Sequence, residues 1–185
     1  MQFGNSTATC FTVDVDGKQY IVTARHALPD IEKNLTIQLQ HNKEWEDLTC
    51  SLVSIGDGGI DIAVLAASHR ISPLHQLEPT MNDMFLSQNV YFLGFPYGIQ
   101  ADVGALNADF TLPLVKKACV SMLTTSPGES NYLFLDGHSN PGFSGGPVIF
   151  SLHDKPETEE LLLSFQVTGL GGTRYLCRTK KPIWR

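Results

Sequence analysis

The stretch Asp136-Gly-His-Ser-Asn-Pro-Gly-Phe-Ser-Gly-Gly-Pro147 decides how this chain folds and where its chemistry lies. It places Ser144 in a turn that is rich in glycine and closed by proline, where small neighbours leave the hydroxyl open. Gly142 and Gly145 allow backbone conformations that other residues resist. Consecutive N–H groups beside a hydroxyl can point at one spot, which is how a site for a developing oxyanion is built. The stretch therefore predicts a nucleophilic serine.

Two upstream motifs supply the partners that such a serine needs. His26 ends the run T-A-R-H and Asp61 begins the run D-I-A-V-L, so histidine, aspartate and serine occur in the order of a known triad. An isolated histidine after a strand is usually structural, but its place ahead of Ser144 favours a catalytic role. Asp61 stands among apolar residues, where a hydrogen bond to the histidine ring would offset the cost of burial. Asp57 is the alternative acid, although two glycines follow it and indicate a loop.

The run around Ser144 also satisfies G-x-S-x-G, the nucleophile elbow of α/β-hydrolases. That elbow needs a helix after the serine and the triad order serine, acid, histidine. The β-branched run Pro147-Val-Ile-Phe150 follows instead and favours a strand. The one histidine after Ser144 is His153, and no acid lies between the two. The elbow interpretation fails on chain order.

The motifs resemble those of the trypsin-like (chymotrypsin-fold) serine peptidases, and most closely the bacterial HtrA-like and related single-domain branch. The resemblance rests on T-A-R-H, on D-I-A-V-L, on N-P-G-F-S-G-G-P-V around Ser144 and, more weakly, on Val90-Tyr-Phe-Leu-Gly-Phe-Pro96. Together these runs span most of the chain in the family's order. The resemblance implies an all-β fold of two six-stranded antiparallel β-barrels, with the active site in the cleft between them.

The resemblance also implies a serine endopeptidase that needs no metal or cofactor. His26, Asp61 and Ser144 would form the catalytic triad, and the backbone N–H groups of Gly142 and Ser144 would bind the oxyanion. Two other classes stay open: a catalytically inactive protease fold that serves as a binding module, and a serine esterase that uses the same triad. All three candidate residues are present, which argues against the binding module.

Substrate contacts follow from the resemblance alone. His138, six positions before Ser144, would lie at the base of the S1 pocket, although it could equally be an ordinary loop histidine. Because His138 is not an acid, cleavage after lysine or arginine would lack a charge partner unless Asp136 or another acid reaches in, and a small or apolar P1 residue is expected. The glycine-rich run after Val167 would be the wall along which a substrate adds a strand. Its residues are Thr168, Gly169, Leu170 and Gly171.

Two features depart from the family pattern. Digestive relatives carry aspartate directly before the serine, where a cleaved N-terminus pairs with it on activation, and HtrA-like relatives commonly carry asparagine. This chain has Phe143 there, which would either pack against the barrel and fix the turn or leave it mobile.

Only a short basic tail follows Gly172, and Tyr175 to Cys177 would supply a short closing strand. A shortened second barrel would expose an edge that a partner or a second copy would cover.

Strand patterns divide the chain into two barrels that form one peptidase unit. Alternating residues predict strands over 11–15, 20–24, 35–39, 48–55 and 60–66 in the first barrel, with a hairpin turn at Asp16 and Gly17. Strands over 114–124, 131–135, 147–152 and 161–170 follow in the second, which begins near Asn89. The polar linker spans about 68–83. We place the N-terminal barrel, with His26 and Asp61, at 1–75 and the C-terminal barrel, with Ser144, at 76–185.

Composition excludes several classes of partner. The 185-residue chain carries a net charge of −6, which offers no basic stripe for a nucleic acid or an anionic membrane. No apolar run approaches the roughly 20 residues that cross a bilayer, and the N-terminus lacks a signal-peptide pattern. The four cysteines, Cys10, Cys50, Cys119 and Cys177, form no C-x-x-C pair. Reduced thiols in a cytoplasmic protein that acts on peptides are the expectation.

Overall fold

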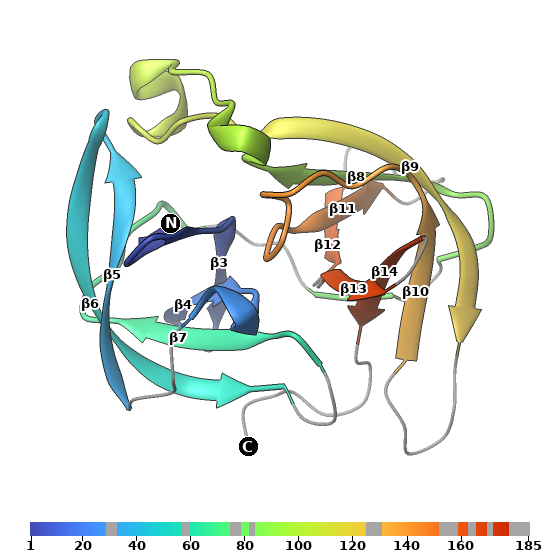
Figure 1. Ribbon diagram of the computed structural model, residues 1–185, viewed down its shortest axis with the longest axis horizontal. Helices are drawn as coiled ribbons and strands as arrows, with labels where there is room; N and C mark the ends of the chain where they lie inside the picture. Colours follow the sequence, from blue (N-terminus) through green and yellow to red (C-terminus); the bar gives the residue numbers. More distant parts are fainter. Residues whose placement is uncertain are drawn as a thin grey trace.

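The computed structural model describes most of the chain as two curled antiparallel sheets joined by a linker, seen side by side in Figure 1. The described residues are 1–28, 33–56, 60–74, 79–81, 84–124, 131–151, 159–162, 166–169 and 172–177. Side chains are described only as far as residue 151, and that of Asn131 is not. No helix in these ranges is long and apolar enough to span a membrane.

The first sheet has the strand order β2-β1-β5-β6-β7-β4-β3. Its strands are β1 (Gln2–Phe3), β2 (Ser6–Thr7), β3 (Cys10–Val15), β4 (Lys18–Thr23), β5 (Asn34–His41), β6 (Glu44–Ile55) and β7 (Ala63–Ala67). The two edge strands, β2 and β3, are neighbours in the chain, so the sheet curls back on itself into a barrel. The predicted hairpin turn between β3 and β4 is confirmed, since Asp16 and Gly17 both have positive φ, 49° and 75°.

The second sheet has the order β12-β11-β8-β9-β10-β14-β13. Its strands are β8 (Asn89–Gly94), β9 (Leu114–Thr124), β10 (Asn131–Asp136), β11 (Val148–Ser151), β12 (Glu159–Leu162), β13 (Gln166–Gly169) and β14 (Gly172–Cys177). The edge strands β12 and β13 are again consecutive in the chain, so the second sheet also curls into a barrel, although β12 and β13 do not pair with each other in the described residues. The expected double β-barrel is thus confirmed, with seven strands in each sheet among the described residues rather than six.

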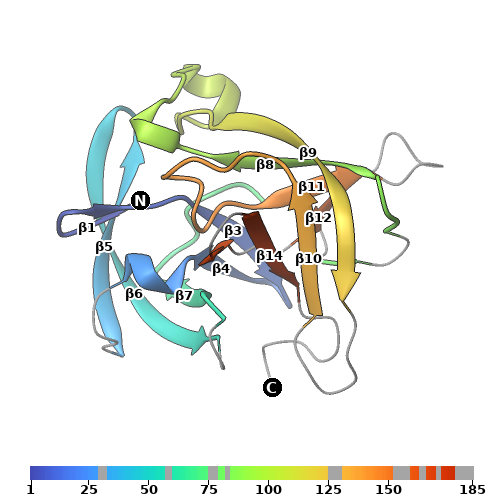
Figure 2. The ribbon, with the colours of Figure 1, turned by 45° about the vertical axis from the view of Figure 1, so that its right-hand side comes forward.

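Three details of the strands differ from the expectation. The single strand expected over 161–170 is two strands, because β12 pairs with β11 while β13 pairs with β14 at the other edge. The strand expected over 60–66 starts at Ala63, so Asp61 precedes it in a loop. The closing strand expected over 175–177 is present and begins earlier, at Gly172, where β14 runs beside β10 (Figure 2).

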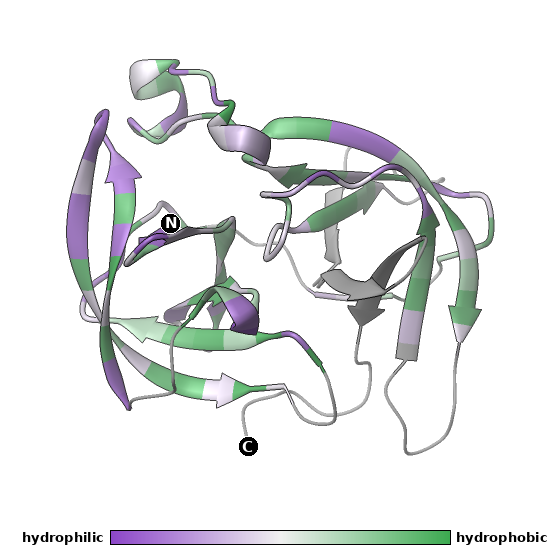
Figure 3. Cartoon of the chain, viewed as in Figure 1, coloured by the Kyte–Doolittle hydropathy of each residue, from purple (hydrophilic) through white to green (hydrophobic). Residues whose placement is uncertain are grey.

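Each barrel has its own apolar core, and a third cluster lies where the barrels meet. Green apolar segments follow the strands in Figure 3, while the tip of the β5–β6 hairpin is polar. The first core is centred on Ile21, Ile37 and Leu65, none of which is exposed. The third cluster includes Val13 and Val64 of the first sheet, and Tyr132 and Ile149 of the second sheet pack against it. The second core is built from Val90, Phe92, Ala118, Val120, Leu133, Leu135, Phe143, Val148 and Phe150.

Polar contacts also connect the first sheet to the segments beyond it. The Gln19 side chain on β4 accepts hydrogen bonds from the N–H groups of Ile71 (2.9 Å) and Ser72 (3.1 Å), which holds the start of the linker on the first sheet. At the β5–β6 hairpin tip, Lys43 Nζ lies 2.7 Å from Asp102 Oδ2, beside the short 3-10 helix η3 (Gly104–Asn107). The predicted domain boundary at 75/76 falls between the last strand of the first sheet and the first strand of the second and stays a prediction.

Candidate active site

His26 and Asp61 are held together by two hydrogen bonds. His26 lies in the 3-10 turn η1 (Arg25–Ala27), directly after β4, and Asp61 lies just before β7. Because β4 and β7 are paired strands, the end of one lies beside the start of the other. Asp61 Oδ2 lies 2.5 Å from His26 Nδ1, and Asp61 Oδ1 accepts the backbone N–H of His26 at 2.8 Å. The Asp61 carbonyl also accepts the N–H of Arg25 at 3.3 Å.

This pairing sets the chemistry of the imidazole. An Nδ1–H that donates to Asp61 leaves Nε2 without a proton in the neutral ring, so Nε2 can act as a base. The hydrogen bond that His26 donates to Asp61 raises the pKa of His26, partial burial opposes this, and the negative charge of Asp61 adds to the increase. The His26 side chain remains 57% exposed while that of Asp61 is 18% exposed, so the basic nitrogen is open to a substrate.

The turn that carries Ser144 lies against the strand that leads to His26. In Figure 1 the orange loop between β10 and β11 reaches toward the first sheet. Gly145 has a positive φ of 80°, and a Cβ there would lie 2.6 Å from the backbone nitrogen of Ala24, two residues before His26. Gly142 has φ of 104°, and a Cβ there would lie 2.7 Å from the Phe95 carbonyl oxygen. Both positions therefore require glycine, as the sequence indicated.

Thr9 ties this turn to both barrels. Its backbone N–H donates to the Ser144 carbonyl at 3.1 Å, and its hydroxyl donates to the Gly142 carbonyl at 2.6 Å. The same hydroxyl accepts the N–H of Phe95 at 3.1 Å. The hydroxyl of Thr23 donates in turn to the Thr9 carbonyl at 2.8 Å. Thr9 and Thr23 are only 2% and 0% exposed, so both side chains are held inside the protein and their hydrogen bonds fix the turn there.

The groups expected to act on a substrate form no hydrogen bonds to other described residues. The Ser144 hydroxyl and the backbone N–H groups of Gly142 and Ser144 make no hydrogen bond to any residue in the described ranges. His26 Nε2 likewise has no such partner there. Hydrogen bonds between a nucleophile and its base often form fully only when substrate binds. The free donors of the turn could therefore bind a developing oxyanion.

Phe143 packs into the second barrel, which decides between the two alternatives left open for it. Its side chain is 5% exposed and belongs to the core cluster. Its ring lies edge-on to Phe92, with centroids 4.9 Å apart and planes at 69°. Its backbone N–H donates to the Asn140 carbonyl at 3.3 Å, and its carbonyl accepts the N–H of Gly146 at 2.9 Å. The residue before Ser144 thus anchors the turn by burial.

The structure describes only some of the residues that were expected to contact the substrate. His138 is exposed, and its carbonyl oxygen accepts a hydrogen bond from Lys116 Nζ at 2.9 Å. Thr168 and Gly169 lie on β13, opposite Thr173 and Gly172 of β14. Leu170 and Gly171, and the alternative acid Asp57, lie outside the described residues.

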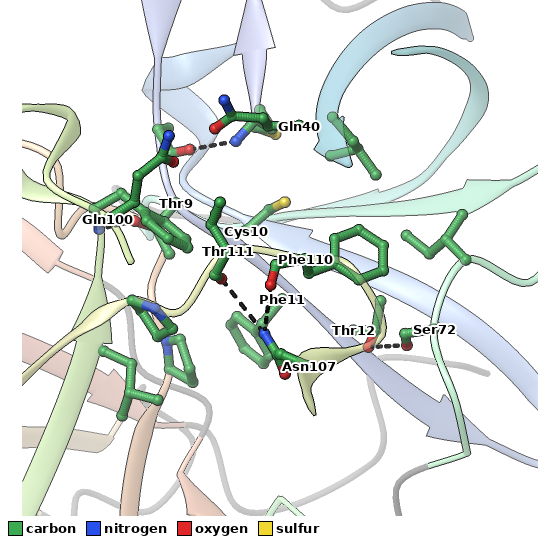
Figure 4. Close-up of a pocket in the computed structure, with 18 of the residues that line it drawn as sticks. Thr9, Cys10, Phe11, Thr12, Gln40, Ser72, Gln100, Asn107, Phe110 and Thr111 are labelled. Atoms are coloured by element: carbon green, nitrogen blue, oxygen red, sulfur yellow. Dashed lines mark hydrogen bonds between the residues drawn. The ribbon is translucent and has the colours of Figure 1, made fainter. Parts of the chain in front are cut away.

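A separate cavity of about 1000 Å³ lies behind the turn. Figure 4 shows it between β3, the η3 segment and the linker, with Thr9, Phe11 and Phe110 among its labelled lining residues. Gly142 also lines it, whereas His26, Asp61 and Ser144 do not. The cavity therefore contacts the back of the turn and is not the candidate substrate cleft.

The sequence interpretation missed Thr9, because a threonine before a strand carries no motif of its own. Cys10, Cys50 and Cys119 are free cysteines in the described structure. Burial raises the pKa of Cys50 to about 11. Within the described residues no group of three or more His, Cys, Asp or Glu side chains is arranged to hold a metal ion.

Comparison with known proteins decides the family. Residues 8–152 match the model of the trypsin-like peptidase domain. The chain belongs to this peptidase family. The matched range contains the His26, Asp61 and Ser144 motifs, so the resemblance drawn from those motifs is confirmed. No curated protein matches the chain.

Solved structures of proteases share the fold of this peptidase domain. The MamO protease domain from Magnetospirillum magneticum, in its apo form, is 17% identical with a TM-score of 0.52, over 86% of this chain and 77% of that one. Rv3671c from M. tuberculosis H37Rv, an inactive serine-to-alanine mutant, is 18% identical with a TM-score of 0.57, over 93% and 76%. The HtrA-type protease AlgW with a decapeptide is 18% identical with a TM-score of 0.57, over 91% and 47%. At these identities the likeness shows the fold alone.

Proposed function

We propose that this peptidase domain is a serine endopeptidase that hydrolyses peptide bonds through His26, Asp61 and Ser144. The observation that carries the proposal is the double hydrogen bond between Asp61 and His26, beside a Ser144 turn whose backbone is docked on the adjacent strand. A carboxylate that fixes the imidazole tautomer prepares the ring to take a proton from a neighbouring serine hydroxyl.

The reaction would proceed in two acyl transfers. Ser144 Oγ forms a bond to the scissile carbonyl carbon, its proton passes to His26 Nε2, and the carbonyl electron pair becomes the oxyanion. The N–H groups of Gly142 and Ser144 would stabilise that oxyanion. His26 then returns the proton to the leaving amine as the C–N bond breaks. A water molecule repeats the sequence on the acyl-enzyme and releases the carboxylic acid and free Ser144.

An extended peptide substrate would add to the second sheet at β13, because β13 is an edge strand. It is the last strand in the order of the second sheet and pairs only with β14 in the part of the chain that the structure describes. An edge strand offers free N–H and C=O groups to a peptide that adds to the sheet. Thr168 and Gly169 of β13 would then bind the substrate backbone, together with Leu170 and Gly171 directly after them.

The charge near His138 indicates which P1 residues would be disfavoured. The Lys116 ammonium group bonds to the His138 carbonyl, so a positive charge lies at the position expected to form the base of S1. A lysine or arginine P1 side chain would meet this charge in place of an acid. A small or apolar P1 residue is therefore the proposed preference.

A panel of peptides and esters tests the proposed function. Wild-type protein and Ser144→Ala are incubated with an internally quenched peptide library and with simple acyl esters, and cleavage sites are read by mass spectrometry. Internal peptide cleavage that disappears in Ser144→Ala supports the endopeptidase. Turnover of esters alone would identify an esterase, and peptide binding without any turnover would identify a binding module.

A further inference from the structure

Lys116 contacts three successive parts of the segment that leads into the Ser144 turn. It lies on β9, and its Nζ donates to the carbonyl oxygen of His138 at 2.9 Å and to the side-chain oxygen of Asn140. The same Nζ lies 5.5 Å from the centre of the Phe143 ring, within the range of a cation–π contact. One ammonium group therefore joins positions 138, 140 and 143 to the strand behind them.

These contacts continue into the turn itself. The Asn140 carbonyl accepts the N–H of Phe143 at 3.3 Å, and the Asn140 side-chain nitrogen donates to the Tyr97 hydroxyl at 3.3 Å. Because Lys116 has no acceptor, its contact fixes the Asn140 oxygen toward Nζ and the nitrogen toward Tyr97. Asn140 is thus held from two sides while its backbone supports Phe143, the residue between Gly142 and Ser144.

Among the described residues, the ammonium group of Lys116 contacts this segment and forms no ion pair. Its side chain is half-buried, and no carboxylate of a described residue forms an ion pair with it. The neighbouring Lys117 is exposed and takes part in none of these contacts. A partly buried ammonium without a carboxylate partner is costly unless neutral acceptors satisfy it, and here a carbonyl, an amide oxygen and a ring face do so.

We propose that Lys116 is a positioning residue that holds the 138–143 segment so that the N–H groups of Gly142 and Ser144 stay directed at the oxyanion. The proposal rests on the proposed serine peptidase chemistry. A methionine at position 116 would keep the apolar stem against Phe143 but lose both hydrogen bonds and the charge. An arginine would keep the charge and N–H donors, with a planar geometry that satisfies the two oxygens less well.

The labelling rate of Ser144 by an alkyl fluorophosphonate tests this role, because its P=O oxygen needs the same donors. We expect Lys116→Met to lower the limiting labelling rate by about 10- to 100-fold with little change in half-saturating concentration. Lys116→Arg should recover part of the rate. Lys117→Met, the matched control, should label within about twofold of wild type, as expected for an exposed residue. Equal loss in both methionine variants, or a wild-type rate in Lys116→Met, would overturn the proposal.

Hydrogen exchange separates a failure of Lys116 from a failure of the triad. Exchange of the peptide that spans 136–147 is measured by mass spectrometry in the same variants, without substrate. Faster exchange of this peptide, which contains the bonded N–H groups of Phe143 and Gly146, in Lys116→Met but not in Lys117→Met supports positioning even if wild type takes no label. Unchanged exchange in Lys116→Met would reject it. An unlabelled wild type would count against the peptidase chemistry alone.

Discussion

The Thr9 hydroxyl donates a 2.6 Å hydrogen bond to the carbonyl oxygen of Gly142, although 133 positions separate the two residues in the chain. This bond links the start of the first barrel to the glycine whose N–H is a candidate oxyanion donor. The Thr9 backbone N–H binds the Ser144 carbonyl as well, so one buried residue holds both flanks of Phe143. The geometry of the turn therefore depends on the contact between barrels.

Replacing Thr9 by valine should loosen this turn while leaving the barrels folded. Valine has nearly the same shape but neither donates to Gly142 nor accepts from Phe95, so two half-buried backbone groups lose their partner. We expect the free energy of unfolding to fall by about 1–3 kcal/mol and fluorophosphonate labelling to slow by about tenfold. Thr9→Ser keeps the hydroxyl and should stay near wild type. Thr7→Val, at an exposed position two residues away, is the control, and equal effects of both valines would refute this role.

Asp61→Asn tests the partner of the imidazole. The asparagine side-chain oxygen can still accept the hydrogen bond from the backbone N–H of His26, so the fold should persist. The asparagine NH₂ group favours the wrong tautomer of the ring, so turnover should fall by a factor on the order of 10⁴. Circular dichroism and thermal unfolding check the fold, and steady-state hydrolysis checks the rate. Near-full activity in Asp61→Asn would remove Asp61 from the triad and return attention to Asp57.

The raised pKa of His26 predicts a specific pH dependence. The neutral ring is the base, so kcat/KM should rise with pH through a midpoint above the ordinary histidine value. Asp61→Asn should move this midpoint to lower pH. The stabilising contribution of protonated His26 is present below its unfolded-state pKa and is lost as pH rises through the folded-state pKa. Titration of the His26 ring protons by NMR measures the midpoint directly, and a value at or below that of an unfolded peptide would contradict the geometry.

Cys50 should resist alkylation in the folded protein. Burial, with a smaller contribution from the nearby Cys10, raises the pKa of the Cys50 thiol to about 11, and the thiolate is the reactive form. Iodoacetamide at about pH 8 should modify Cys119 before Cys50, and both after unfolding. Peptide mass spectrometry reads the two sites. Equal rates at both cysteines in the native protein would show that Cys50 is not shielded.

The sequence predicts the residues whose roles are encoded in local motifs. His26, Asp61 and Ser144 are recognisable because short runs of neighbours accompany each, and the structure places Asp61 against His26 as expected. The alternating strands and the Asp16–Gly17 turn are local patterns of the same kind. The glycines at 142 and 145 could be identified because their backbone conformations exclude other residues.

Residues that act through tertiary contacts could not be found in this way. Thr9 and Lys116 are ordinary strand or pre-strand residues, and only the docking of distant segments gives them the Gly142 and His138 carbonyls as partners. The break between β12 and β13 was missed for a similar reason. No proline or charge interrupts residues 161–170, so they can be taken for one strand, and it is pairing with different neighbours that separates β12 from β13.

The central claim is that Ser144 is an activated nucleophile, and labelling by a fluorophosphonate read by intact mass tests it most directly. Wild-type protein should gain one adduct, and both Ser144→Ala and His26→Ala should abolish it. No adduct on well-folded wild-type protein, or an adduct that survives in Ser144→Ala, would contradict the claim.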